Sequence, residues 1–120
     1  LIESDERIFT WFARDVMNPT TGGGRWLEWL ESLKQIDGPV HLTIDIDGLD
    51  GSLVPATGTP VPGGLSFWHV DQTIDVLFEN CDVISADVNE IVAQLDTPLT
   101  EFTAAMIATK IISAYIGKEV

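Results

Sequence analysis

The feature that most constrains the fold is a change of pattern at Gly48. Residues 40–47, VHLTIDID, alternate between apolar and polar side chains, which predicts a β-strand with one apolar and one polar face. A period of two places Asp45 and Asp47 on the same face. The alternation then stops, and a long connection rich in proline and glycine, PATGTPVPGG, indicates an ordered loop. Two carboxylates at the carboxyl end of a strand lie where open α/β sheets bind ligands.

The rest of the chain is predicted to alternate between strands and helices. The predicted strands are residues 8–13, 40–47 and 82–89, and the predicted helices run from Arg25 to Gly38-Pro39, from Ser66 as N-cap to about Asn80, and from Thr97-Pro98 to about Tyr115. This order implies right-handed crossovers and a parallel sheet covered by helices, which is an α/β fold. Because three parallel strands make a thin sheet, we expect residues 1–120 to be one domain that continues a longer polypeptide.

Helical spacing supports the last two helices. In the helix that follows Ser66, a stripe at i, i+3 and i+4 spacing predicts the core face, and in the last helix residues at similar spacing indicate that the helix continues to about Tyr115. These positions are Phe67, Val70, Ile74, Leu77 and Phe78 in the first case, and Phe102, Ala105, Met106, Thr109 and Ile112 in the second.

Composition excludes several classes of partner. The chain has 19 acidic and 6 basic residues and a net charge of −13, which disfavours binding to nucleic-acid phosphates and favours cations. We find no apolar run long enough to cross a membrane and no secretory signal at the N-terminus, so we expect a cytoplasmic protein without a membrane partner. The single cysteine, Cys81, fits a reducing compartment and is predicted to be a small buried side chain.

Asp45 and Asp47 could belong to several kinds of carboxylate site. An EF-hand calcium loop starting at Asp45 fails, because Leu49 and Ala56 occupy its fifth and twelfth positions. The sequence DIDG resembles the opening of the haloacid dehalogenase phosphatase motif, in which the first aspartate is a nucleophile. Leu49 stands where that family prefers threonine or valine, and the loop that follows does not resemble it.

A third motif matches more residues. TIDIDGLDGSLVPATGTPVPGGLS closely resembles the signature of the ureohydrolase superfamily, the arginases, agmatinases and their relatives, and ADVNE at 86–90 resembles the D-x-x-E segment of that family. The resemblance covers about residues 40–116. It implies an arginase/deacetylase-like fold of three layers, α/β/α, around a parallel sheet, with this chain supplying the last three strand-helix units.

The resemblance also implies a chemistry for the acidic residues. Asp45 would bridge two manganese ions and Asp47 would be a terminal ligand of one, so that a shared hydroxide attacks the guanidino carbon and releases urea. Glu90 would face the guanidinium group of the substrate, and Asp87 would support the site rather than bind metal. Such proteins act on small guanidino compounds, and their relatives are often homotrimers or homohexamers.

The sequence departs from the family pattern at several places. The family's first metal-binding motifs, a histidine and an aspartate-histidine-aspartate cluster, have no counterpart, and we assign no catalytic residue within the chain. Gly51 replaces the usual proline, and Ile91-Val92 follow Glu90 where relatives often have a small residue and proline. We therefore expect the chain alone to lack most metal ligands and to be inactive. The alternative is a non-catalytic α/β domain that serves in assembly.

The remaining polar residues are predicted to have structural roles. Asp50 is expected to hold the turn from Gly48 to Ser52. His41 shares a face with Asp45 but lies nearer the start of the strand, so a structural hydrogen bond is expected for it. His69 is expected to be partly exposed on its helix.

Overall fold

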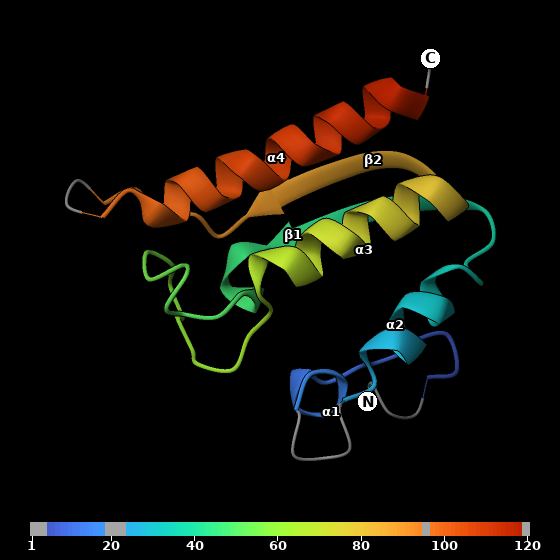
Figure 1. Cartoon of the computed structure of the whole chain (residues 1–120), viewed down its shortest axis with the longest axis horizontal. Helices are drawn as coiled ribbons and strands as arrows, with labels where there is room; N and C mark the ends of the chain where they lie inside the picture. The colour runs from blue at the N-terminus through green and yellow to red at the C-terminus, as the bar shows by residue number, and fades with distance from the viewer. Residues whose placement is uncertain (1–4, 19–23, 95–96, 119–120) are drawn as a thin grey trace.

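The computed structural model describes residues 5–18, 24–94 and 97–118. Its elements are α1 (Ala13–Val16), α2 (Trp26–Leu33), β1 (Pro39–Asp45), the 3-10 turn η3 (Ile46–Gly48), α3 (Phe67–Asn80), β2 (Asp82–Asn89) and α4 (Leu99–Lys118). Two strand-helix units, β1 with α3 and β2 with α4, form the main body, and α2 lies against α3 (Figure 1).

The two strands form a parallel sheet with one apolar and one polar face. Their register pairs Thr43 with Asp87 and Asp45 with Asn89, after an irregularity between Val40 and His41. The apolar side chains of both strands pack on the core, where α3 and α4 lie against β2. The long loop after β1, the segment after β2 and the start of α4 gather at the carboxyl ends of the strands (Figure 1).

The helix after Ser66 follows the prediction closely. Ser66 caps α3 by accepting a hydrogen bond from the backbone of His69, and the imidazole of His69 accepts one from the Ser66 backbone in return. The core face is buried as expected at Val70, Ile74, Leu77 and Phe78, while Phe67 is half-buried. His69 is half-buried, as expected, and burial lowers its pKa.

The strand predicted at residues 8–13 is absent. Residues 8–12 have no regular structure, α1 begins at Ala13, and Phe9 is 83% exposed. Trp11 instead packs edge-on against Trp29 of α2, at a ring distance of 6.1 Å, and lies under the guanidinium of Arg25. Trp11 therefore joins this segment to α2, and no described strand pairs with it.

Helices α2 and α4 exist as predicted but differ in their bounds. Helix α2 ends at Leu33, before Gly38-Pro39, and its stripe is buried at Leu30 and Leu33. Helix α4 begins just after Pro98 and continues past Tyr115 to Lys118. Lys110 of α4 lies 2.6 Å from Asp75 and 3.2 Å from Asp71, which ties α4 to α3 by ion pairs.

The residues whose spacing indicated helix α4 are exposed, and its buried side chains lie at other positions. Phe102, Met106 and Ile112 are each more than half exposed, whereas the buried side chains are Thr100, Thr103, Ala104, Ile107 and Ile111. Both sides of the helix are apolar, so spacing alone could not separate them. By length and composition Leu99–Gly117 could cross a membrane, and the expectation that no segment is long and apolar enough was wrong. In the structure this helix packs on α3 and β2.

The α/β fold class is confirmed. The chain contributes a parallel sheet whose strand β2 is followed and preceded by covering helices. The described residues hold two of the three expected strands and place the polar sides of both in solvent. A second helical layer over that polar face is not among the described residues.

Candidate functional site

The loop after β1 is fastened to the strand end by Asp50. Its Oδ1 accepts from the backbone N–H and the hydroxyl of Ser52, and its Oδ2 accepts from the N–H of Gly63 at 2.7 Å. Backbone bonds between Asp50 and Leu65 and between Leu65 and Gly48 close the loop. The hydrogen bonds from Ser52, and then those from Gly63 and Gly64, lower the pKa of Asp50 to about 2. Asp50 therefore holds the turn, as predicted.

Asp45 and Asp47 lie at the mouth of this loop, on different elements. Strand β1 ends at Asp45, and Asp47 belongs to the 3-10 turn η3, so the prediction of a strand through residue 47 was wrong at its end. The argument from a period of two does not apply to Asp47. Its Oδ2 accepts a hydrogen bond of 2.7 Å from the hydroxyl of Thr59, across the loop. Asp45 is exposed, and its side chain makes no hydrogen bond or ion pair within the described residues.

Glu90 begins the segment that follows β2, one residue beyond the partner of Asp45 in the sheet. Its φ is +65°, the left-handed region that disfavours side chains with a Cβ. The residue is exposed, and two residues later the N–H of Val92 donates to the carbonyl of Ala56 in the loop. A strained non-glycine residue at a strand end is a feature of functional sites.

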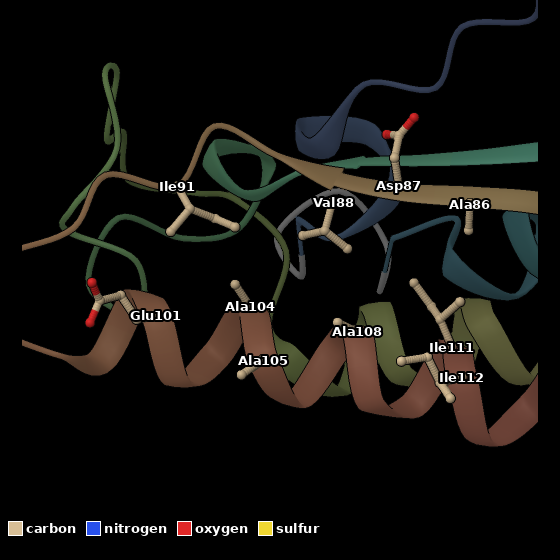
Figure 2. Close-up of a pocket in the computed structure, with 10 residues that line it drawn as sticks. All are labelled: Ala86, Asp87, Val88, Ile91, Glu101, Ala104, Ala105, Ala108, Ile111 and Ile112. Carbon is tan, nitrogen blue, oxygen red and sulfur yellow. The ribbon is translucent and has the colours of Figure 1, made fainter.

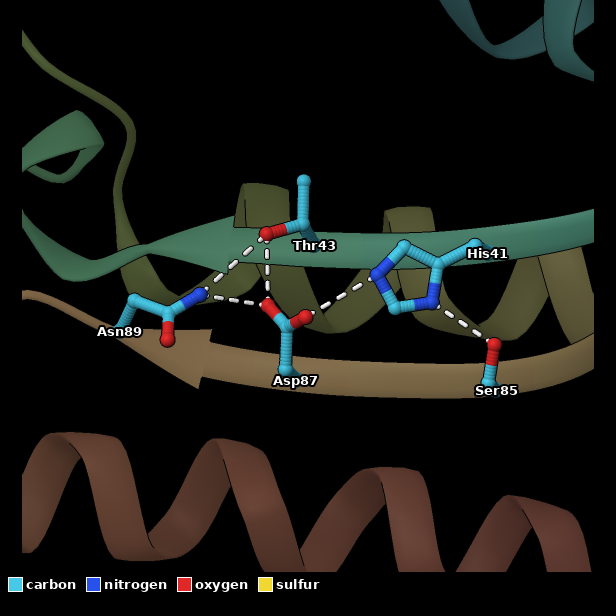
Figure 3. Close-up of polar contacts among 5 residues, drawn as sticks. All are labelled: His41, Thr43, Ser85, Asp87 and Asn89. Carbon is cyan, nitrogen blue, oxygen red and sulfur yellow. Dashed lines mark hydrogen bonds and ion pairs between the residues drawn. The ribbon is translucent and has the colours of Figure 1, made fainter.

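A polar network joins the two strands beside these ends (Figure 3). Asp87 is its centre: its Oδ1 accepts from the Thr43 hydroxyl at 2.6 Å and from the Asn89 amide at 2.5 Å, and its Oδ2 lies 3.0 Å from His41 Nε2. His41 Nδ1 lies 2.7 Å from Ser85 Oγ. The bond from Thr43, followed by those from Asn89 and His41, lowers the pKa of Asp87, so it is a carboxylate at neutral pH.

This network confirms one prediction and adds residues that the sequence reasoning missed. His41 makes structural hydrogen bonds, as expected. The supporting role expected for Asp87 stays a prediction. Thr43, Asn89 and Thr59 were not singled out. Thr43 and Asn89 could have been found, because the period of two places them on the faces of Asp45 and Asp87.

The carboxylates of this chain fit part of a manganese site. Their oxygen atoms suit manganese, and Asp45 is a free carboxylate next to one held by a hydroxyl. Within residues 5–18, 24–94 and 97–118, however, no three histidine, cysteine, aspartate or glutamate side chains are grouped so that they could hold a metal ion. Further ligands would have to come from other polypeptide.

An apolar groove of about 530 Å³ runs between β2 and α4 on the other side of the strand (Figure 2). Ala86 and Val88 point from β2 towards α4, whereas Asp87 points away from the helix (Figure 2). Ile91 lies at one end of the groove, above Glu101. The groove lining is almost entirely apolar, so the polar chemistry of the chain lies on the opposite face.

The two departures from the expected signature have local explanations. Gly51 donates its N–H to the carbonyl of Val61 at 2.8 Å, and an added Cβ would lie 3.0 Å from that oxygen. Proline has no N–H, so it could not make this bond. Val92 donates its N–H to the carbonyl of Ala56, and a proline at position 92 could not make that bond either. These positions keep the loop closed by backbone bonds.

Comparisons with known proteins agree in one family. Residues 5–114 match the model described as the arginase family. The N(1)-aminopropylagmatine ureohydrolase of Thermococcus kodakarensis is 39% identical over 77 residues, which are 64% of this chain and 27% of that protein. The agmatinase of Pyrococcus horikoshii is 32% identical over 99 residues, with 76% of this chain and 35% of that protein covered.

A solved structure shows the same arrangement. The crystal structure of a hypothetical agmatinase from Burkholderia thailandensis superposes with a TM-score of 0.71 at 31% identity, covering 93% of this chain and 38% of that one. The chain thus spans about a third of the length of the relatives it matches.

Proposed function

The chain belongs to the arginase family, and on that premise we propose that the complete protein containing it is a manganese-dependent amidinohydrolase that releases urea from a small guanidino compound. In this reaction water adds to the guanidino carbon, the C–N bond to the amine breaks, and the amine leaves with a proton. Relatives named as arginase, agmatinase and N(1)-aminopropylagmatine ureohydrolase support the reaction class.

The observation that carries the proposal is the free carboxylate of Asp45 at the end of β1. It is exposed and has no hydrogen-bond partner in the described chain, while its neighbour Asp47 is held by Thr59. Asp45 and Asp47 would each hold manganese, which suits carboxylate oxygen. When bound, manganese supplies Lewis acidity that activates water at neutral pH.

Glu90 would bind the guanidinium group of the substrate. The sheet register pairs Asp45 with Asn89, so Glu90 follows at the same end of the sheet. A carboxylate there can make charge-assisted hydrogen bonds to a planar cation. The left-handed backbone of Glu90 costs conformational free energy, and such strained residues cluster at functional sites, which supports a role beyond that of a solvated side chain.

The other parts of the site would lie in polypeptide outside this chain. Two aspartates do not make a site for two metals, and the matched region covers only 27% and 35% of the two relatives. Helix α4, apolar on both sides, is also typical of the interior of a larger fold. The isolated chain would therefore be inactive, and we propose a cytoplasmic homo-oligomer for the complete protein.

The test is urea release by the complete protein with manganese across a panel of guanidino compounds. Wild-type protein should release urea from at least one compound, and Asp45→Asn should lose both bound manganese and urea release. Glu79→Gln, which changes an exposed carboxylate at the end of α3, serves as the control. Absence of urea across the panel, or unchanged metal and activity in Asp45→Asn, would favour a non-catalytic domain that serves in assembly.

A further inference from the structure

We propose that Asp87 is a positioning residue that sets the distance between the metal-binding end of β1 and the substrate-binding end of β2. This inference rests on the proposed function, because it assigns roles to Asp45 and Glu90. The hydrogen-bond partners of the Asp87 side chain are Thr43, Asn89 and His41, so it bonds to neither Asp45 nor Glu90. It acts through Thr43, two residues before Asp45, and through Asn89, one residue before Glu90.

The geometry makes Asp87 a clamp between the strands. Its Oδ1 accepts from Thr43 on β1 and from Asn89 on β2, and Asn89 also donates to Thr43 at 3.4 Å. These three side chains close a triangle beside the last pair of the sheet, Asp45 with Asn89. Because hydrogen bonds to an ionised carboxylate are shorter and stronger than neutral ones, the triangle resists sliding or splaying of the strand ends.

The clamp also explains how Glu90 stays in its strained conformation. Strained backbone conformations persist only where contacts with the surrounding structure hold them in place. Glu90 is held on one side by Asn89, whose amide is fixed by Asp87, and on the other by the bond from Val92 to Ala56. Loss of the Asp87 carboxylate would free one of these two anchors and move Glu90 relative to Asp45.

Because His41 can change its tautomer, an asparagine at position 87 can keep the hydrogen bonds of the clamp while removing the negative charge. Since a carboxylate only accepts, His41 Nε2 must donate to Asp87, and in the neutral imidazole Nδ1 then accepts from the Ser85 hydroxyl. In Asp87→Asn the amide oxygen can keep the bonds from Thr43 and Asn89. The amide nitrogen can donate to Nε2 if the proton of His41 moves to Nδ1, which then donates to Ser85. The asparagine therefore preserves every connection without the charge.

The experiment compares Asp87→Ala, Asp87→Asn and Ser85→Ala in the complete protein, with kcat, KM and manganese affinity as readouts. Asp87→Ala should lower kcat by about tenfold to 100-fold, the range found when groups that orient a site are removed, with manganese affinity within threefold of wild type. Asp87→Asn should restore kcat to within about fivefold. Ser85→Ala, at the far end of the network, should change neither constant beyond about threefold.

Three results would overturn the proposal. Unchanged kcat in Asp87→Ala would show that the clamp does not position the reaction. An equal loss of kcat and of manganese in Asp87→Asn would make Asp87 a metal ligand instead. An equal loss in Ser85→Ala would indicate general destabilisation.

A second measurement does not depend on activity. If the wild-type protein releases no urea, the proposed function fails, and a double-mutant cycle of Thr43→Val with Asp87→Ala still tests the clamp itself. If the unfolding equilibrium constant of the double variant differs by about fivefold or more from the product of the two single effects, the two residues are coupled and the clamp is supported. If the two effects simply add in free energy, the clamp is refuted.

Discussion

The hydroxyl of Thr59 donates a hydrogen bond of 2.7 Å to Oδ2 of Asp47, across a loop of which both residues are part. One oxygen of Asp47 is thereby occupied and the orientation of the carboxylate is fixed, while its other oxygen accepts no hydrogen bond from the described residues. The loop thus orients a candidate ligand before any metal arrives, which is the role of groups around a metal site.

Replacing Thr59 should weaken manganese binding without unfolding the protein. Thr59→Val keeps the shape of the side chain and removes the donor, and we expect about a tenfold loss of manganese affinity in the complete protein. Thr59→Ser keeps the hydroxyl and should stay within threefold of wild type. Metal titration by calorimetry measures both. Equal affinities for the valine and serine variants would show that the hydrogen bond does not orient a ligand.

Asp50 should make the loop sensitive to acid. Its pKa is lowered from 3.8 to about 2 in the folded protein, so the stabilisation it contributes is present above 3.8 and is lost as the pH falls towards 2. Both of its oxygens accept, so Asp50→Asn places an amide nitrogen against a donor and should destabilise the protein at neutral pH.

Denaturant unfolding between pH 2 and pH 6 measures this effect. The wild-type midpoint should fall with decreasing pH more steeply than the midpoint of Asp50→Asn. Glu79→Gln is the matched control, because that carboxylate is exposed and makes no hydrogen bond within the described part of the chain. Parallel pH profiles for wild type and Asp50→Asn would contradict the role assigned to Asp50.

Glu90 should lower the free energy of unfolding through its strained backbone while its carboxylate contributes to substrate binding. Glycine at this position relieves the cost of φ +65° but adds freedom to the unfolded chain, so Glu90→Gly should raise the free energy of unfolding by about 0.5–1 kcal/mol. Glu90→Gln keeps the strain and should leave stability within about 0.5 kcal/mol. Both should lower kcat/KM for a guanidino substrate by about tenfold or more, because both remove the carboxylate.

Thermal unfolding and urea release, measured on the same preparations, check this pair. A glycine variant that is less stable than wild type would show that the side chain of Glu90 makes stabilising contacts. Full activity in both variants would remove Glu90 from the substrate site.

The close approach of the two ends of the loop, at Leu49-Asp50 and Gly64, depends on the glycine. A Cβ at this position would overlap the backbone of Leu49 and lie 2.6 Å from the Asp50 nitrogen. Gly64→Ala should therefore destabilise the protein by about 1–3 kcal/mol. At Gly58 an added Cβ meets nothing within 4 Å, so Gly58→Ala should change stability by less than about 0.5 kcal/mol. Equal free energies of unfolding for the two variants would contradict this packing.

The elements that could be predicted from the sequence are those whose residue pattern fits only one kind of secondary structure. The alternation before Gly48 and the Ser66 cap define β1 and α3, because few other structures satisfy them. Residues 8–13 are apolar, which fits a strand or a loop that packs on a helix, and only the contact of Trp11 with Trp29 decides. The buried side of α4 was unpredictable for the same reason.

The residues proposed for the site could be named from the sequence, but the connections between them could not. Asp45, Asp47 and Glu90 stand in recognisable motifs, and their roles stay predictions. The bond from Thr59 to Asp47 depends on how a long loop folds back, which no local pattern specifies. The end of β1 at Asp45 also reflects the 3-10 turn that follows, whose bond from Leu49 to Ile46 competes with strand pairing.

The most direct test of the account is a crystal structure of the complete protein grown with manganese, with anomalous scattering used to locate the metal. We predict manganese within coordination distance of both the Asp45 and the Asp47 carboxylates, with Glu90 facing the same space. Manganese bound elsewhere, or Asp45 and Asp47 turned apart and bonded only to protein groups, would contradict it.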